Sequence, residues 1–234
     1  MNYTRSTSNY KFLILICLLL SACGTNNLPD KEQTQIVVEQ KTPTPIPTDS
    51  ATTIGDGGLF SEQSCKPPCF WGITPGITHE LEAWEILKSK EVSSVCQTWD
   101  NTNESGTRGI ECNLNKGILS IGLESKQDGI RFVGFAPSNV IHISDVIEKY
   151  GEPTCIAIWD GDSPEHIETE VTIFYDSITT RLDFSSQDGS VYNLRPESEI
   201  TGVSYLSLQE YTAYIKSIEG SLFSWKGYGE YQKK

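Results

Sequence analysis

The feature that most constrains the fold of this chain is a pattern that occurs twice. Short matches recur at a nearly constant spacing, each within a segment of the same predicted secondary structure. The matched positions are Trp99-Asp100 with Trp159-Asp160 and Gln127-Asp128-Gly129 with Gln187-Asp188-Gly189, 60 residues apart, and Cys96 with Cys155 and Pro137 with Pro196, 59 apart. Self-similarity at a fixed period is the signature of a repeated structural unit. We therefore expect two copies of one unit.

Each copy is predicted to be a helix followed by antiparallel strands. The first helix is expected from Thr78 to Lys90, and the second from Ser144 to Tyr150, before a glycine and a proline that end it. The apolar face of the first helix is expected to comprise Ile77, Leu81, Trp84 and Leu87. Strands are expected at 94–99, 109–114, 118–123, 130–135, 155–159, 170–175, 180–184 and 191–195. This order predicts an α+β fold with helices on one face of a sheet.

The N-terminus has the pattern of an export signal. Arg5 and Lys11 precede an apolar run from Phe12 to Leu20, which is too short to span a bilayer. The run ends in Ser21-Ala22-Cys23-Gly24, which resembles a bacterial lipobox with Cys23 as the lipidated first residue. The alternative is an ordinary secretory signal with an incidental cysteine. We expect residues 1–22 to be removed and acyl chains on Cys23 to anchor the protein to a membrane, facing outside the cytoplasm.

Residues 23–63 are predicted to be a disordered tether. Asn, Gln, Thr, Pro, Lys and Asp dominate this stretch, and TPTPIPT at 42–48 alternates with proline. Such a composition offers little apolar surface to bury. The formal net charge of the chain is −13, which argues against nucleic acid as a partner because that partner requires Lys and Arg patches. The acidic surface is expected to keep an exported domain soluble.

Two short motifs resemble a known family. The first is Ile73 to Thr78 (ITPGIT), which opens a predicted helix, and the second is Val146 to Pro153 (VIEKYGEP), which closes one. They resemble the two halves of the BLIP/SmpA-type repeat, whose members include β-lactamase inhibitor protein and the small lipoprotein of the outer-membrane assembly machine. The first copy lacks the family's "GxP" helix end, and the second lacks its "GxT" helix start. The resemblance implies a tandem α+β repeat that acts as a binding module rather than an enzyme.

The start and end of the folded part also resemble uncharacterised bacterial lipoproteins with C-x3-C-W-x-G-I-T-P-G-x-T. Here the corresponding stretch is CKPPCFWGITPGIT, from Cys65 to Thr78. Some of those lipoproteins carry a C-terminal W-x-G-Y-G-x-Y, like Trp225 to Tyr231 here.

The cysteines of the folded part are expected to form disulfides, as is usual outside the cytoplasm. Cys96 and Cys112 lie on adjacent predicted strands, symmetric about a loop, where opposed Cβ atoms come close enough to bridge. Cys65 and Cys69 surround two prolines, and extended geometry there would hold their Cα atoms beyond the roughly 7 Å bridging limit. Either a cis proline allows a Cys65–Cys69 staple, or one of the two reaches Cys155.

We predict no cofactor, no metal site and no catalytic site. The C-x3-C spacing differs from the C-x-x-C of redox motifs, and the histidines show no ligand spacing. Asp160, Asp162 and Glu165 alternate as in a calcium loop but lack the remaining ligands of an EF-hand, and a solvated hairpin loop is the simpler interpretation. The alternative function is an envelope hydrolase that uses these carboxylates.

Aromatic residues near both ends of the folded part are candidate contact residues. We expect Phe70 and Trp71 to pack onto the core, and a binding edge is the alternative. A capping box at Ser207 to Glu210 predicts a third helix that ends at Gly220. The aromatic tail that follows either clamps the chain end or contacts a partner; its members are Phe223, Trp225, Tyr228 and Tyr231.

These observations together predict a non-catalytic binding or assembly module of the cell envelope. Its expected parts are a signal peptide (1–22), a lipidated tether (23–63), a first α+β unit (64–137), a second α+β unit (138–207), and a C-terminal helix with an aromatic tail (208–234). The expected partners are the membrane, through the lipid anchor, and an envelope protein or glycan.

Overall fold

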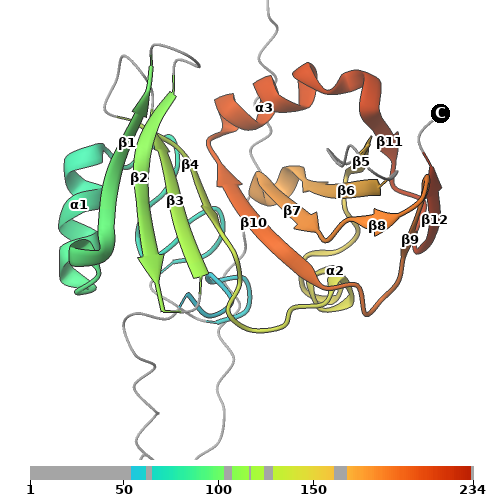
Figure 1. Cartoon of the computed structure of the whole chain (residues 1–234), viewed down its shortest axis with the longest axis horizontal. Helices are drawn as coiled ribbons and strands as arrows, with labels where there is room; N and C mark the ends of the chain where they lie inside the picture. The colour runs from blue at the N-terminus through green and yellow to red at the C-terminus, as the bar shows by residue number, and fades with distance from the viewer. Residues whose placement is uncertain are drawn as a thin grey trace, which may run out of the picture. The chain divides into compact units, whose positions relative to one another are not determined.

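Alternating apolar residues assemble into one large, mostly antiparallel sheet (Figure 1). The structure is a computed structural model, which describes residues 54–61, 65–102, 107–115, 117–123, 129–160 and 168–232. Its helices are α1 (Glu80–Ser89), α2 (Ile143–Tyr150) and α3 (Leu208–Ser217). Its strands are β1 (Cys96–Asn101), β2 (Thr107–Leu114), β3 (Gly117–Leu123), β4 (Ile130–Phe135), β5 (Cys155–Asp160), β6 (Glu168–Tyr175), β7 (Thr180–Phe184), β8 (Gln187–Asp188), β9 (Val191–Leu194), β10 (Ile200–Leu206), β11 (Leu222–Ser224) and β12 (Gly229–Gln232). The fold is α+β, as predicted.

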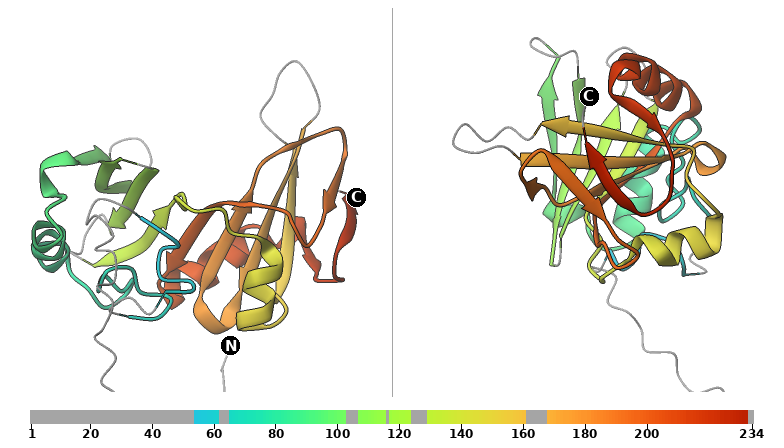
Figure 2. Two further views of the ribbon diagram at one scale, coloured as in Figure 1. Left: turned by 90° about the horizontal axis from the view of Figure 1, so that it is seen from below. Right: turned by 90° about the vertical axis from the view of Figure 1, so that its right-hand side faces the viewer.

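Two four-stranded meanders meet in the middle of the sheet. Its strand order is β1-β2-β3-β4-β10-β7-β6-β5-β11, with β8 paired to β6. The first meander is β1 to β4, and the second consists of β5, β6, β7 and β10. Their last strands pair antiparallel, with Val203 opposite Phe135 and Tyr205 opposite Val133. Helix α1 precedes the first meander and α2 the second, and Figure 2 shows each helix beside its own strands.

One face of this sheet carries the main hydrophobic core. Helix α1 contributes Ala83 and Leu87 to it, and α2 contributes Ile143 and Val146. The central strands contribute every second residue, as a half-buried pleated strand requires. Their buried side chains include Ile110, Leu119, Ile121, Val133, Phe135, Ile156, Ile158, Val171, Ile173, Leu182, Val203 and Tyr205. Helices α1 and α2 therefore share one face of the sheet.

Helix α3 packs on the opposite face. Its Tyr211 lies in a second cluster with Phe174 of β6 and Leu206 of β10. The Ser207 Oγ accepts a hydrogen bond of 3.1 Å from the Glu210 backbone N–H, which is the cap that the sequence predicts. The Glu210 carboxylate binds the Arg131 guanidinium of β4 at 3.0 and 2.6 Å. This two-point ion pair fixes the first turn of α3 to the middle of the sheet.

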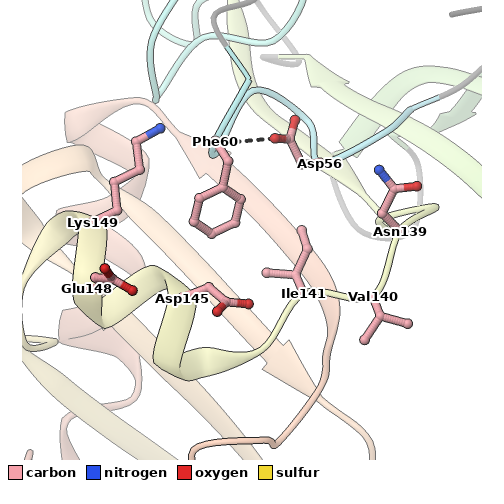
Figure 3. Close-up of a pocket in the computed structure, with 8 residues that line it drawn as sticks. All are labelled: Asp56, Phe60, Asn139, Val140, Ile141, Asp145, Glu148 and Lys149. Carbon is pink, nitrogen blue, oxygen red and sulfur yellow. Dashed lines mark hydrogen bonds between the residues drawn. The ribbon is translucent and has the colours of Figure 1, made fainter.

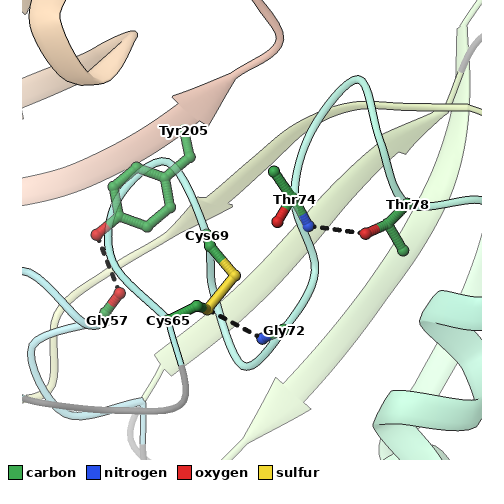
Figure 4. The surroundings of a disulfide bond; sticks show 7 residues. All are labelled: Gly57, Cys65, Cys69, Gly72, Thr74, Thr78 and Tyr205. Carbon is green, nitrogen blue, oxygen red and sulfur yellow. Dashed lines mark hydrogen bonds between the residues drawn. A yellow bond between two sulfur atoms is a disulfide. The ribbon is translucent and has the colours of Figure 1, made fainter.

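The segment from Cys65 to Trp71 closes the bottom of the core. Cys65 and Cys69 are disulfide-bonded, with Cα atoms 5.7 Å apart, and the Pro67–Pro68 peptide is cis. Figure 4 shows this bond beside the buried ring of Tyr205. Phe70 is fully buried, and its ring centroid lies 4.9 Å from that of Phe135. Of the two predicted alternatives, the Cys65–Cys69 staple is the one that forms.

The Cys96–Cys112 disulfide is also present, as predicted. The two residues are directly opposed on β1 and β2. Cys155 is a free, half-buried thiol on β5. Its prediction as an alternative partner of Cys65 or Cys69 is therefore wrong, because those two residues bind each other.

The predicted apolar face of α1 needs a correction. Ile77 is 74% exposed and Leu81 is 78% exposed, whereas Ala83 and Leu87 are fully buried. Ile77 lies in a turn before the helix, since α1 begins only at Glu80. The buried face of α1 is therefore rotated about the helix axis relative to the predicted apolar face.

The last strand of the second meander was predicted at the wrong place. The predicted segment, 191–195, coincides with β9 (Val191–Leu194), which pairs with the C-terminal strand β12 outside the main sheet. The place beside β4 belongs to β10, which the sequence analysis did not predict. Hydrophobic alternation alone could not decide between these segments, because β10 carries an irregularity between Ile200 and Gly202 that breaks its period of two.

Only some of the positions that repeat in the sequence occupy equivalent places in the two meanders. Trp99 and Trp159 lie on β1 and β5, the first strands of the two meanders. Pro137 follows β4, but Pro196 follows β9, so these prolines do not end equivalent strands of the sheet. The Gln187–Asp188 pair forms β8, and residues 127 and 128 lie outside the described residues.

Candidate functional site

The sheet face opposite α1 and α2 is only partly covered by α3. Two hollows of about 470 and 420 Å³ open on this face, on either side of Arg181 and Asp183. We call the surface that lines them the open face. The residues that line it include Trp99, Glu111, Ser120, Phe132, Gly134, Ser204, Gly202, Arg181, Asp183, Thr172, Glu170, Trp159 and Asp160.

The floor of the larger hollow is made of small residues. Ser120 of β3 is the cross-strand partner of Gly134 of β4, which is in turn the partner of Ser204 of β10. A Cβ atom added to Gly134 would meet nothing closer than the Ser204 Oγ, at 3.5 Å. The space above this row is therefore open, and side chains of another molecule could reach the strands themselves.

Two aromatic side chains of the first meander border this floor. The Trp99 ring covers Gly109 of β2, and the Phe132 ring covers Gly122 of β3. Each ring lies over the glycine that is its cross-strand partner. Glycine at these two positions is required sterically, because an added Cβ would overlap the ring atoms.

An ion pair separates the two hollows. The Arg181 Nε and Nη2 both donate to the Asp183 Oδ2, at 3.1 and 2.9 Å, and its Nη1 donates to the Tyr214 hydroxyl at 3.3 Å. The other Asp183 oxygen accepts from the Thr172 hydroxyl at 2.9 Å. Burial lowers the pKa of Arg181, but the charge of Asp183 and the Tyr214 hydroxyl outweigh it and raise the pKa above its ordinary value. The Arg181 guanidinium is therefore permanently positive, and the Asp183 carboxylate already neutralises its charge.

The smaller hollow lies at the other end of the open face. It is bordered by Trp159 and Asp160 of β5, by Glu170 of β6, and by Tyr214 of α3. Trp159 is directly opposite Glu170 in the β5–β6 register. The half-buried indole of Trp159 and the exposed Glu170 carboxylate therefore stand next to each other.

A third hollow, of about 620 Å³, lies between α2 and the segment 54–61 (Figure 3). Asp56 is its most constrained carboxylate, since it accepts hydrogen bonds from the Gly58, Phe60 and Ser61 backbones and from the Ser61 hydroxyl. Burial raises the pKa of Asp56, and these hydrogen bonds outweigh that effect and lower it. The Lys149 amine donates to the Leu59 carbonyl at 2.6 Å. Asp56 thus fixes the turn within the segment 54–61, and Lys149 ties that segment to α2.

The predicted aromatic contact residues are mostly inside the protein. Phe70, Trp71 and Tyr231 are 0%, 8% and 2% exposed, so the alternative that they form a partner surface is wrong. Trp225 and Phe223 are partly buried against the core, and the Trp225 ring stacks with that of Tyr231. Tyr228, which is 40% exposed, is the exception. The tail packs the chain end through the pairing of β11 with β5 and of β12 with β9.

The described ranges contain only some of the other predicted site residues. Asp160 is exposed at the end of β5, next to the smaller hollow. Asp162, Glu165 and the predicted lipidation site, Cys23, lie outside the described residues. The two described histidines, His79 and His142, are the N-cap residues of α1 and α2. The smaller hollow therefore brings Asp160 and its sequence neighbour Trp159 together with Glu170 of β6.

Comparison with known proteins gives no identification. No protein-family model, curated protein or solved structure matches the chain. None of the helices in the described ranges is long and apolar enough to cross a membrane. In the same ranges no three His, Cys, Asp or Glu side chains are placed to hold a metal ion together.

The open face could not be predicted from the sequence because its floor is made of small residues. Ser120 and Ser204 carry no signal individually. The one available signal was Gly134 itself, because a glycine inside a predicted strand marks a position that another group approaches closely.

Proposed function

We propose that this protein is a lipid-anchored lipoprotein of the cell envelope whose folded part binds another envelope macromolecule, a protein or a glycan, through the open face. The lipobox-like Ser21 to Gly24 and the tether-like composition of the residues before Ile54 support the location. The predicted tether, 23–63, is too long at its end, because Ile54 and Leu59 are fully buried in the main core. The observation that carries the binding role is the floor of small residues in the larger hollow, on an open face that has Trp99 in one hollow and Trp159 in the other. Antiparallel sheets commonly expose one face to solvent, and what distinguishes this face is its pair of half-buried tryptophans, Trp99 and Trp159, a residue type enriched at protein–protein interfaces.

We also propose that the two meanders are copies of one BLIP/SmpA-type unit. The order helix, then four strands, occurs as α1 with β1 to β4 and again as α2 with β5, β6, β7 and β10. The fourth strands of the copies pair antiparallel, which is the arrangement expected if an approximate twofold axis relates them. Trp99 and Trp159 occupy the first strand of each copy on the same face of the sheet. In this proposal β8 and β9 are an insertion before the fourth strand of the second copy.

A steric block tests the binding role. Gly134→Leu should fill the larger hollow without disturbing the fold, because an added Cβ meets only ordinary contacts there. Thr98→Leu is the matched control, since Thr98 is exposed on β1 and points to the other face than Trp99. Tagged protein is crosslinked in intact envelopes and purified with its partner. We expect Gly134→Leu to lose a partner that both the wild type and Thr98→Leu recover; equal recovery by Gly134→Leu would refute the proposal.

A further inference from the structure

A tryptophan stands beside a carboxylate at each end of the open face. On β5 and β6, Trp159 is directly opposite Glu170. On β1 and β2, Trp99 is opposite Gly109, and Glu111 follows two residues later on the same face. In an antiparallel pair such diagonal neighbours remain within reach of an aromatic side chain. The same two chemical groups are thus presented twice.

The charges of this surface are predominantly negative. The described charged side chains that line the two hollows are those of Glu111, Asp160, Glu170, Asp183 and Arg181. Arg181 is the single positive group among them, and it is bound to Asp183. Neither Glu111 nor Glu170, the two carboxylates that stand beside Trp99 and Trp159, forms an ion pair with Arg181.

We propose that the partner presents basic side chains, lysine or arginine, to these two places, an inference that rests on the proposed function of the same face. A cation is attracted to the face of an indole, and tryptophan is the strongest of the aromatic rings in this respect. A neighbouring carboxylate adds a charge-assisted hydrogen bond. Trp99 with Glu111 forms one cation site, and Trp159 with Glu170 forms the other. The occupant is a basic segment of an envelope protein rather than a glycan.

The strand order fixes the distance that such a segment must span. Glu111 is on β2 and Glu170 on β6, and five strand spacings lie between them in the sheet. At about 4.8 Å per spacing this is roughly 24 Å across a flat sheet. The row in register with Glu111 reaches β6 at Phe174, four residues from Glu170, which adds about 13 Å along the strand. The two carboxylates are therefore roughly 27 Å apart, and an extended segment of about nine residues covers this distance. The small residues between the two sites, Ser120, Gly134 and Ser204, leave room for its backbone.

Peptide binding followed by NMR tests this inference without knowledge of the natural partner. The probe is the capped nine-residue peptide KSGSGSGSK, and ESGSGSGSE is the control peptide. The chain has five tryptophans, so each indole N–H gives a resolvable signal. We expect the lysine peptide to shift the signals of Trp99 and Trp159 only, and the glutamate peptide to shift neither.

Charge-neutral variants supply the second arm of the test. Glu111→Gln and Glu170→Gln should each raise the Kd of the lysine peptide about 3-fold, and together about 10-fold. Glu82→Gln, which removes an exposed charge of the same kind on α1, should leave the Kd unchanged. Equal weakening by Glu82→Gln, or shifts at the other tryptophans, would mean nonspecific attraction and would overturn the inference.

Recovery of the natural partner from crosslinked envelopes distinguishes a failure of this inference from a failure of the proposed function. If Gly134→Leu loses the partner and the Glu111→Gln/Glu170→Gln double variant keeps it, the open face binds something uncharged, such as a neutral glycan. The basic segment is then wrong while the binding role stands. If Gly134→Leu also keeps the partner, the binding role of the face is wrong.

Discussion

The indole of Trp99 lies so closely over Gly109, its cross-strand partner, that a Cβ atom at residue 109 would come within 2.5 Å of the indole Cζ2. The same Cβ would also overlap the backbone carbonyl of Ile121 on β3. The position of Trp99 on the open face therefore depends on the absence of a side chain in the neighbouring strand.

Gly109→Ala should displace Trp99 and destabilise the first meander. Overpacking of this kind costs typically about 1–3 kcal/mol, and the backbone contact places Gly109→Ala near the upper end. Urea denaturation measures the free energy of unfolding, and near-UV circular dichroism reports the displaced indole. Gly220→Ala is the control, because nothing lies within 4 Å of a Cβ there. A Gly109→Ala protein as stable as Gly220→Ala would show that Trp99 is not held in this place.

Removing the Cys96–Cys112 bond should destabilise the protein, because the unfolded chain gains conformational entropy when the cross-link is absent. The bond closes a loop with a sequence separation of 16. The chain-entropy description assigns about 3 kcal/mol to a loop of this length. We expect this loss for Cys96→Ala/Cys112→Ala in urea denaturation, whereas Cys155→Ala, which removes no bond, should lose far less. Peptide mapping under non-reducing conditions that finds both thiols free in the wild type would contradict the prediction.

Local signals in the sequence were sufficient for some parts of the fold. The Cys96–Cys112 bond could be predicted because both residues flank one hairpin loop. The cap at Ser207 could be predicted because the groups that it binds lie within four residues. In both cases the residues that interact are close together in the sequence.

The pairing of distant segments could not be predicted in this way. Val191–Leu194 has the alternation of a sheet strand, yet Ile200–Leu206 occupies the place beside β4. That choice depends on the fit of Val203 and Tyr205 against Phe135 and Val133, residues far apart in the chain. The open face follows from the same pairing, since Gly134 and Ser204 become neighbours only when β4 and β10 meet.

Cys23→Ala tests the anchor on which the proposed location rests. A lipoprotein that cannot be acylated should leave the membrane fraction or persist as a larger, unprocessed precursor. Cys17→Ala is the matched control, because Cys17 lies within the apolar run of the signal and would be removed with it. Fractionation and gel mobility measure both outcomes. A Cys23→Ala protein that stays membrane-bound at its mature size would disprove lipidation at this residue.

Cys155 should react slowly with thiol reagents in the folded protein. Burial, and then the charge of Asp176, raise the pKa of the Cys155 thiol from 9.0 to about 11. At pH 8 this shift lowers the thiolate population about 100-fold, and the higher nucleophilicity of a basic thiolate offsets part of that, so we expect labelling slower by about 10- to 100-fold. Iodoacetamide labelling with mass spectrometry measures the rate, and urea-unfolded protein is the reference. Equal rates in the folded and unfolded protein would rule out the raised pKa.

The raised pKa of Cys155 also affects stability. Because the folded state holds this proton more tightly, the contribution to stability is complete below pH 9 and is lost as the pH rises toward 11. Cys155→Ala should lose less stability than the wild type over that interval.

Tyr205→Phe should loosen the segment 54–61 from the core. The Tyr205 hydroxyl donates to the buried Gly57 carbonyl at 3.0 Å, as Figure 4 shows, and its removal leaves that carbonyl without this partner. The expected loss is about 1–3 kcal/mol in urea denaturation. Tyr150→Phe is the matched control: its hydroxyl donates to the Leu59 carbonyl, which keeps the Lys149 amine as a second donor, so the loss should be smaller.

Alkaline titration gives the same tyrosine a second, independent readout. Burial, and then the nearby Tyr150 and Asp56, raise the pKa of Tyr205 above its ordinary value of 10.0. The folded state therefore retains the hydroxyl proton where the unfolded chain releases it, and the stability that this provides is present below pH 10 and declines above it. Each such tyrosine contributes a loss of about 1.4 kcal/mol per pH unit in that range. Because the unfolded tyrosine is only half ionised at pH 10, the full slope is reached only above pH 11, and between pH 10 and 11 the stability of Tyr205→Phe should fall by about 1 kcal/mol less than that of the wild type. Identical slopes would show that the Tyr205 hydroxyl is not buried.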